Sequence, residues 1–503
     1  MLKIALILVL CFILSFLVVV SVSIPSAGVG GELRKAWESV RGGVEIESPS
    51  VIYEGVVSLG LFLFVIAVLT LDMRYRHFLA ILAVSAVVFM GVVPPQKLIE
   101  SVDWALIVFL VGSMGFAAIL RKLGVFTYLA AHIVKISKGR PLLLLTLLSV
   151  LAWFTAMVVD EVTSIVYVIM VVLELSRILR IDPDELVILV VLATNTGSLA
   201  LPVGNPIGVY IAFTTGFTPR DFILAALPLS AICFLATVIL FSTLRVKYVR
   251  KLALAISSRS DMLEAFITTK IVDVAPKERN ARIYGVALLL AFLGTISITP
   301  LLAEFLTSIS GFHVDSNSLL ALVPYLFIAL TLPVTEAPEL GEVIAKGVEW
   351  PSITFFMFLF MLGYSLTWSG AMVKVAYGTI TLSQTINPGL LSLFIVLMFS
   401  SAILSAFLDN LSLVVALVPA IELVVGVTGA RELFWSILFG GVLGGNLTPI
   451  GSTANIVAVS ILERRRKVKT DWVKWLKISL PVAVVHLILT SAWSLVLLEH
   501  GLL

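Results

Sequence analysis

A stretch of twelve residues near the C-terminus, Gly444–Asn455, has the composition of a binding site inside a membrane. It reads GGNLTPIGSTAN and lies within an apolar region from Leu433 to Leu462. Because Pro449 lacks a backbone donor and glycine lowers helix propensity, the helix is expected to break here. A broken helix at membrane depth can bind an ion or a small polar solute. The candidate ligands in this stretch are Thr448, Gly451, Ser452, Thr453 and Asn455.

A second stretch of the same kind occurs earlier in the chain. Gly197–Gly208 reads GSLALPVGNPIG, and its Pro202–Asn205 matches Pro449–Ser452 at an offset of 247 residues. One break alone could be a proline kink satisfied by neighbouring helices. Breaks at corresponding places in two halves point instead to the site of a transporter. Gly204 and Asn205 therefore join the candidates.

Carboxylates follow two long uncharged runs. Asp160 and Glu161 end the first run, and Asp409 with the neutral Asn410 ends the second. An ionised Asp at the centre of a membrane helix costs about 2.5–3.5 kcal/mol, so such residues tend to face a cavity and carry protons or cations. The alternative is that they cap helical turns by accepting backbone amides. The two roles are compatible, and we expect Glu161 to bind and release a proton during transport.

The composition is that of a membrane protein. The chain has 503 residues, of which 60% are hydrophobic and 13% charged, with a mean hydropathy of +1.12. Soluble proteins average about 25% charged residues. Apolar stretches recur along the whole chain, so the expected fold class is an all-α polytopic membrane protein.

The charge, the cysteine content and the absence of certain motifs exclude several functional classes. The net charge of +3 is too small to indicate a nucleic-acid partner, and the two cysteines, Cys11 and Cys233, lie in apolar segments. The sequence has no HExxH, GxGD or GxSG motif and no GxxxxGK[ST] phosphate loop. An enzyme and an ATP-driven pump are therefore not expected, and no cofactor is expected beyond a coupling ion.

Eleven crossings and two hairpins account for the apolar segments. The hairpins are expected at 141–176 and 389–422, because only 12 apolar residues separate Glu161 from Glu174 and only 11 separate Asn410 from Glu422, too few to span. The expected crossings are 4–24, 51–72, 78–95, 104–120, 186–213, 218–244, 282–303, 318–333, 352–370, 433–462 and 478–498. The first of these could instead be a cleaved signal peptide.

The domain organisation follows from charge and from an internal repeat. Residues 1–50 form an N-terminal helix and external loop, 51–244 the first inverted repeat, 245–281 a cytoplasmic linker, and 282–503 the second repeat. Nine Lys or Arg residues at 245–282 and the basic run at 464–469 predict that the N-terminus lies on the cytoplasmic side of the cell membrane and the C-terminus on the outer side. Matched segments support the repeat: VDW at 102 with VEW at 348, DEVT at 160 with DNLS at 409, and Phe222 with Trp475.

Four stretches of the chain carry a family pattern. The most specific are SAFLDNLSLVVALVP and GGNLTPIGSTANIVAVS, with weaker support from WALIVFLVGSMG and EWPSITFFMFLF. In these stretches the chain resembles the ion transporter superfamily. This group includes citrate-transporter-like and arsenite permeases, D-type sodium/proton antiporters and the P protein. The resemblance implies two re-entrant hairpins, two unwound helices with a site between them, a homodimer in the lipid bilayer, and a transport domain that moves against a scaffold.

Site residues follow from this resemblance position by position. The hairpin tips match at Asp160, Glu161 and Thr163 and at Asp409, Asn410 and Ser412. The unwound loops match at Gly204 and Asn205 and at Gly451, Ser452, Thr453 and Asn455. The halves differ in two places, since Glu161 corresponds to Asn410 and Gly208 to Asn455.

The function expected from these patterns is secondary active transport of a small ion by alternating access. The favoured solute is an anion, a carboxylate or oxyanion, because helix ends and neutral groups can hold it without Lys or Arg. The coupling ion would be a proton or sodium, with hard oxygen ligands at Asn410, Ser412, Ser452 and Asn455. The alternatives are a sodium/proton antiporter, an arsenite or antimonite efflux permease and, more remotely, an ion channel. Thr453→Val and Asn455→Ala are expected to weaken solute binding.

Overall fold

The structure is a computed structural model of the full chain. It describes residues 2–69, 75–159, 161–268, 276–335, 337–408, 410–466 and 469–499, so two candidate residues, Asp160 and Asp409, lie outside the described part. Every regular element in these ranges is helical. Eight of the helices are long and apolar enough to cross a membrane, or nine if one sharply bent pair is counted as a single span. The prediction of an all-α polytopic membrane protein is confirmed.

The first half contains the expected helix pair and broken helix. Each arm of the pair is long and apolar enough to cross a membrane, so the prediction that the second arm is too short to span is wrong. Its hairpin arms are α8 (Pro141–Val158) and α9 (Glu161–Leu179), and its broken helix comprises α10 (Asp184–Ser198), the 3-10 turn η2 (Pro202–Gly204) and α11 (Pro206–Thr215). The other helices are α1 (Leu2–Ser21), α2 (Gly28–Val40), α3 (Pro49–Leu69), α4 (Arg76–Phe89), α5 (Pro95–Glu100), α6 (Trp104–Lys122), α7 (Val125–Ser137) and α12 (Pro219–Leu244).

The second half repeats this order after the linker helices α13 (Val246–Ser257) and α14 (Ser260–Ile267). Its hairpin arms are α20 (Leu390–Ser405) and α21 (Asn410–Thr428), and its broken helix comprises α22 (Phe434–Gly444) and α23 (Thr453–Arg466). The remaining elements are α15 (Pro276–Ser310), α16 (Ser316–Ala329), α17 (Ala337–Gly347), α18 (Trp350–Trp368), α19 (Ala371–Ile386), the 3-10 turn η4 (Arg431–Leu433) and α24 (Trp472–Glu499).

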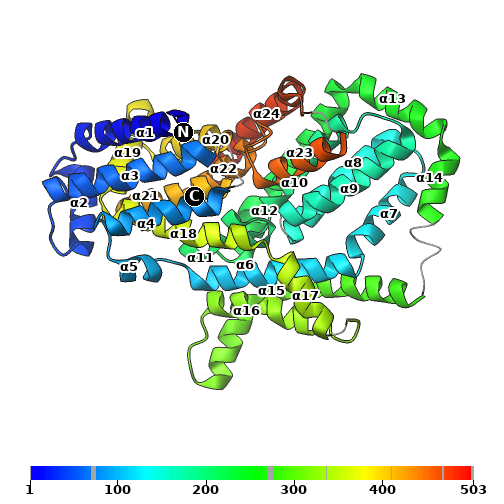
Figure 1. The fold of residues 1–503 in the computed structure, drawn as a ribbon, viewed down its shortest axis with the longest axis horizontal. Coiled ribbons are helices and arrows are strands. Elements are labelled where there is room, and N and C mark those ends of the chain that lie inside the picture. Colours follow the sequence, from blue (N-terminus) through cyan, green and yellow to red (C-terminus); the bar gives the residue numbers. More distant parts are fainter. Residues whose placement is uncertain are drawn as a thin grey trace. The chain divides into compact units, whose positions relative to one another are not determined.

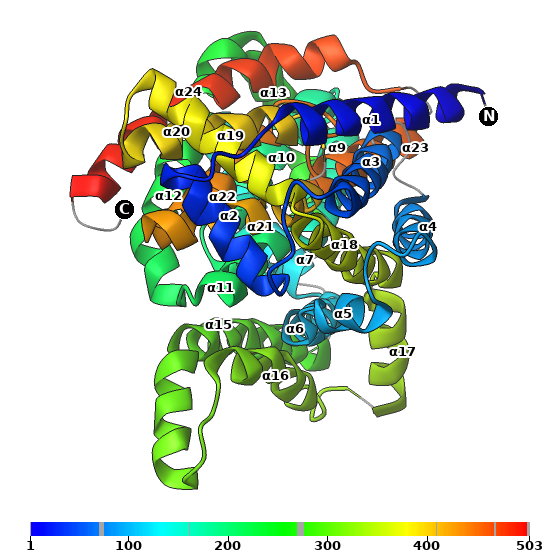
Figure 2. The same cartoon turned by 90° about the vertical axis from the view of Figure 1, so that its left-hand side faces the viewer.

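The helices group into two compact units, each built from both halves of the chain. Unit 1 comprises Met1–Trp104, Trp350–Gly441 and Ser494–Leu503. Within unit 1, α1 lies along α3, and α19 packs against both hairpin arms, α20 and α21 (Figure 2). Unit 2 comprises Ala105–Glu349 and Val442–Trp493.

The core of unit 2 surrounds the first broken helix. In Figure 1, α10 lies among α8, α9, α12 and α23, and each of these helices packs against it. Residues Leu186–Ala193 of α10 are all buried, as expected of a helix covered on every side. The capping residues predicted for α12 are confirmed: Thr218 and Asp221 form a capping box, with Pro219 at the first helical position.

Two polar segments hold more structure than the sequence suggested. The segment 25–50, expected to be a solvated loop, contains the amphipathic helix α2, whose Leu33 and Trp37 are buried in unit 1. Trp37 Nε1 donates to the Thr367 carbonyl at 2.7 Å. The linker likewise contains α13, which buries Tyr248 and Leu252. Each of these helices has only a narrow apolar stripe, and such a stripe is easily missed among charged residues.

Candidate functional site

Asn205 stabilises the first break by forming hydrogen bonds with the backbone on both sides of it. Its Oδ1 accepts from the Gly208 amide at 2.7 Å, which caps α11, and its Nδ2 donates to the Ser198 carbonyl at 2.6 Å. Ser198 is the last residue of α10, so its carbonyl has no partner within that helix. The side chain is only 2% exposed. One asparagine therefore satisfies an orphan group on each side of the break.

Glycine is required where the chain folds back on itself. A Cβ on Gly204 would lie 2.6 Å from the Ser198 carbonyl oxygen and 2.9 Å from that of Ala156, near the end of hairpin arm α8. On Gly197 it would clash with the backbone of Trp153, also in α8. The two glycines thus let the hairpin and the broken helix approach with their backbones nearly in contact.

The second break has a similar pattern of capping, hydrogen bonds and close backbone contacts. Ser452 caps α23, because its Oγ accepts from the Asn455 amide at 3.2 Å. Asn455 Nδ2 donates to the carbonyls of Gly445 and Thr448 at 2.8 and 2.7 Å. A Cβ on Gly451 would lie 2.5 Å from the Gly445 carbonyl oxygen.

Three positions correspond between the breaks at the offset of 247 residues found in the sequence. The capping residues Asn205 and Ser452 match, as do the crowded glycines Gly204 and Gly451. The carbonyls that need a donor, those of Ser198 and Gly445, match as well. The internal repeat is therefore visible in hydrogen bonds as well as in sequence.

The last helices of the two repeats, α12 and α24, show a similar correspondence. His486 Nε2 lies 3.0 Å from the Cys233 carbonyl and 3.0 Å from Thr237 Oγ1. Cys233 and His486 are equivalent at an offset of 253 residues, and so are Thr237 and Thr490. Both threonines donate back to the carbonyl four residues earlier, at 2.9 and 2.8 Å. Equivalent residues of the two repeats thus meet in the middle of unit 2.

Two asparagines that the sequence did not single out join the breaks to each other. Asn195 Nδ2, in α10, donates to Asn446 Oδ1 at 2.9 Å and to Asn455 Oδ1 at 2.8 Å. Ser452 Oγ lies 3.1 Å from Asn195 Oδ1 and 2.7 Å from Asn455 Oδ1. All four side chains are fully buried. We call this the asparagine bridge. The sequence shows an asparagine inside each apolar segment. It does not show that Asn195 and Asn446, which are 251 positions apart, form a hydrogen bond.

Glu161 connects the first hairpin to this network. It lies in the first turn of α9 and is 4% exposed, and its Oε2 accepts from Ser198 Oγ at 3.2 Å. Ser198 Oγ also lies 2.9 Å from the Asn195 carbonyl. Thr155 and Ser164, whose hydroxyls are 2.6 Å apart, join the two hairpin arms below the tip. A polar path therefore runs from the hairpin carboxylate through the first break to the second.

The other predicted ligands lie in three places. Thr448 supplies a carbonyl to Asn455, and its Oγ1 accepts from the Ile450 amide at 3.4 Å. Half-buried Thr163 and Thr453 lie in the first turns of α9 and α23. Asn410 and Ser412 belong to the second hairpin, in unit 1.

In that second hairpin, Ser405 Oγ lies 2.5 Å from Asn410 Oδ1 and 2.5 Å from the Gly441 carbonyl. Ser412 Oγ is buried without a hydrogen-bond partner among the described residues. Of the four residues expected to bind sodium, Asn455 has both side-chain atoms engaged within the protein. Within the described ranges, no three His, Cys, Asp or Glu residues are grouped as a metal site.

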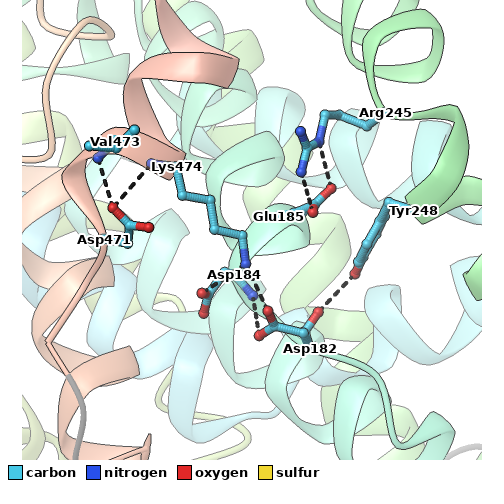
Figure 3. A network of polar contacts seen from close by, with 8 residues as sticks. All are labelled: Asp182, Asp184, Glu185, Arg245, Tyr248, Asp471, Val473 and Lys474. Atoms are coloured by element: carbon cyan, nitrogen blue, oxygen red, sulfur yellow. Dashed lines mark hydrogen bonds and ion pairs between the residues drawn. The ribbon is translucent and has the colours of Figure 1, made fainter.

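Ion pairs fix the end of α10 that lies away from the break (Figure 3). Lys474 Nζ, at the start of α24, lies 2.7 Å from Asp182 and 3.0 Å from Asp184. Arg245 forms a two-pronged pair with Glu185, with Nε 2.8 Å from Oε2. The same hydrogen bonds raise the pKa of the Arg245 guanidinium. The Lys474 pairs join segments of both repeats within unit 2, and the Arg245 pair joins the linker to the first repeat.

Comparison with known proteins places this arrangement in a family. Residues 61–440 match the family described as citrate transporter. This chain belongs to the citrate transporter family. An uncharacterized transporter of Mycobacterium bovis is 26% identical to it over 417 residues, covering 81% of this chain and 91% of that protein. The human P protein is 25% identical over 529 residues, covering 92% of this chain and 62% of that protein. The chain is thus a membrane transporter and not an enzyme, and the predicted superfamily is confirmed.

Proposed function

We propose that the protein is a secondary active transporter that moves a small carboxylate or oxyanion, coupled to sodium or protons, as a homodimer in the cell membrane. The observation that carries the proposal is the asparagine bridge, which joins two helix breaks deep in one compact unit. Unwound backbone in a membrane protein is tolerated only where protein or a polar cavity satisfies it. Such a buried polar arrangement at membrane depth is the usual architecture of a solute site.

The proposed anion would be held by helix ends and neutral groups together with a bound cation, because the charged residues in the hairpins and broken helices, Asp160, Glu161 and Asp409 among them, are carboxylates. No Lys or Arg occurs in 141–176, 186–213, 389–422 or 433–462. The ends of α11 and α23 that face the breaks are helix N-termini, whose free amides and positive dipole ends stabilise negative charge. A carboxylate bound this way is released easily, because no fixed cation retains it. The description of the family as citrate transporter agrees with this solute class.

A sodium/proton antiporter is the second candidate, and Glu161 favours it. A carboxylate that is 4% exposed and hydrogen-bonded to Ser198 is suited to exchanging a proton for a cation. Such a protein would need no anion site.

Uptake into proteoliposomes separates the two candidates. Purified protein would be assayed with radiolabelled citrate, succinate, sulfate and arsenite under imposed sodium or proton gradients. We expect at least one carboxylate to accumulate when a cation gradient is present and to equilibrate when it is absent. Exchange of sodium or lithium for protons with no anion movement would overturn the anion proposal and establish the antiporter.

The orientation that we propose has the N-terminus and the linker 245–281 inside and the C-terminus outside, on the basis of the basic residues near both ends of the linker. Ser258 in the linker is exposed, and the native cysteines Cys11 and Cys233 are buried. Ser258→Cys should therefore resist a membrane-impermeant maleimide in intact cells and react after permeabilisation. Labelling in intact cells would reverse the orientation.

A further inference from the structure

Asn446 has a hydrogen-bond donor that the protein does not use. Its Oδ1 accepts from Asn195, but its Nδ2 has no partner among the described residues, although the side chain is fully buried. Buried polar groups are nearly always hydrogen-bonded, and an unsatisfied one costs about 1–3 kcal/mol. The position is therefore unfavourable unless another molecule completes it.

The orientation of this amide follows from its neighbours. The carbonyls of Gly445 and Thr448 can only accept, so Asn455 must present its Nδ2 to them and its Oδ1 to Asn195. Asn195 must then present its Nδ2, whose second N–H requires an acceptor from Asn446. The Asn446 Oδ1 is thereby fixed toward Asn195, and its two N–H groups are left over.

The other amides of the bridge and the breaks have their donors satisfied inside the protein. Asn195 donates to two side chains, Asn455 to two carbonyls, and Asn205 to the carbonyl of Ser198. Ser452 caps a helix. Asn446 thus differs from the other three asparagines in presenting a free N–H at the junction of the breaks.

The structure assigns Asn446 Nδ2 to the transported anion, as a donor to one of its carboxylate or oxyanion oxygens. This assignment rests on the proposed function. Asn455, by contrast, belongs to the scaffold of the break. A neutral amide supplies direction without a permanent charge, which suits a solute that must be bound and released in every cycle.

The same substitution at two asparagines tests the assignment. Asn446→Asp keeps an oxygen acceptor for Asn195 and replaces the unused amino group with a second oxygen, which also adds a negative charge. Asn455→Asp instead places a carboxylate oxygen against the carbonyls of Gly445 and Thr448. Equilibrium binding of radiolabelled citrate, succinate and sulfate would be measured in detergent, and thermal unfolding would be measured without ligand.

We expect N446D to unfold below the wild-type temperature, because a buried carboxylate is costly, but above N455D, whose carboxylate also faces two carbonyl oxygens. N446D should bind the anion at least about tenfold more weakly, as loss of one hydrogen bond to a charged group implies. N455D should unfold at a clearly lower temperature. If N446D cannot be purified in folded form, Asn446→Ala, which removes the donor without adding charge, must show the same loss of affinity.

Each other result decides a different point. If wild-type protein binds none of the three anions, the proposed function and this assignment fall together. If wild-type protein binds and N446D binds equally well, the assignment alone is wrong. If N446D unfolds as early as N455D, Asn446 is a structural residue and the assignment is also wrong.

Discussion

The first break uses a single residue, Asn205, to cap α11 and to satisfy the Ser198 carbonyl, whereas the second divides these tasks between Ser452 and Asn455. The backbone requirements are the same in both, down to a glycine against the same carbonyl. Because two residues share these tasks, the second break has an additional side-chain amide, that of Asn455. Its Oδ1 accepts a hydrogen bond from Asn195. The repeat thus preserves a backbone shape while the side chains diverge.

The largest effect is expected from filling the shared glycine position. Gly204→Ala or Gly451→Ala would place a Cβ against a backbone carbonyl oxygen at 2.6 or 2.5 Å, and backbone cannot move aside cheaply. We expect each variant to lose about 3 kcal/mol of unfolding free energy or to yield no folded protein. Thermal unfolding of purified protein measures this.

Gly441→Ala is the matched control for these variants. The nearest atom to a Cβ at that position is Val414 Cγ2 at 3.5 Å, an ordinary contact, so stability should be unchanged or slightly higher. Wild-type stability of Gly204→Ala or Gly451→Ala would show that the breaks are less tightly folded back than the structure indicates.

The next effect tests the division of tasks directly. Asn205→Ala removes a cap and leaves a buried carbonyl unsatisfied, so it should cost about 2–3 kcal/mol. Ser452→Ala removes the cap and the contact with Asn195 Oδ1, while Asn455 still holds the Gly445 carbonyl, so it should cost about 1–2 kcal/mol. Thermal unfolding of the two variants side by side provides the test. Equal losses would mean that the two breaks are stabilised in some other way.

Glu161→Gln should change transport more than stability. The amide oxygen of Gln can still accept from Ser198, so unfolding should shift by less than about 1 kcal/mol. The pH dependence of uptake should flatten or disappear, because Gln cannot bind or release a proton. Glu161 is the titratable residue at the repeat position where the second half has the neutral Asn410. Exposed Glu174→Gln is the control. A wild-type rate and pH profile in Glu161→Gln would reduce Glu161 to a helix cap.

The smallest effect is expected at the ion pairs. Lys474→Met removes contacts with Asp182 and Asp184, which are partly exposed, and should cost about 1 kcal/mol or less. The loss should shrink as salt is added, because salt screens exposed charges. A larger, salt-independent loss would mean that these pairs contribute as much as the buried amides do.

The sequence was sufficient to predict features that depend on local chemistry. Proline and glycine within apolar runs predicted both breaks, and Thr218 predicted the start of α12. The asparagine bridge could not be predicted, because an amide in an apolar segment does not reveal which distant residue satisfies it. The structural roles of Asn205 and Asn455 could not be predicted either, because they depend on where the backbone carbonyls of the breaks lie in the folded chain. Asp160 and Asp409 remain predictions.

Unit 2 draws its last segment, Val442–Trp493, from near the end of the chain, and this has a consequence for biosynthesis. Asn195 leaves the ribosome 251 residues before Asn446. At about 5–20 residues per second, the delay is on the order of tens of seconds. During that interval the amide of Asn195 has none of its three partners in the second break, Asn446, Ser452 and Asn455. Water or polar groups of the insertion machinery must therefore form hydrogen bonds with this amide until the second repeat is synthesised.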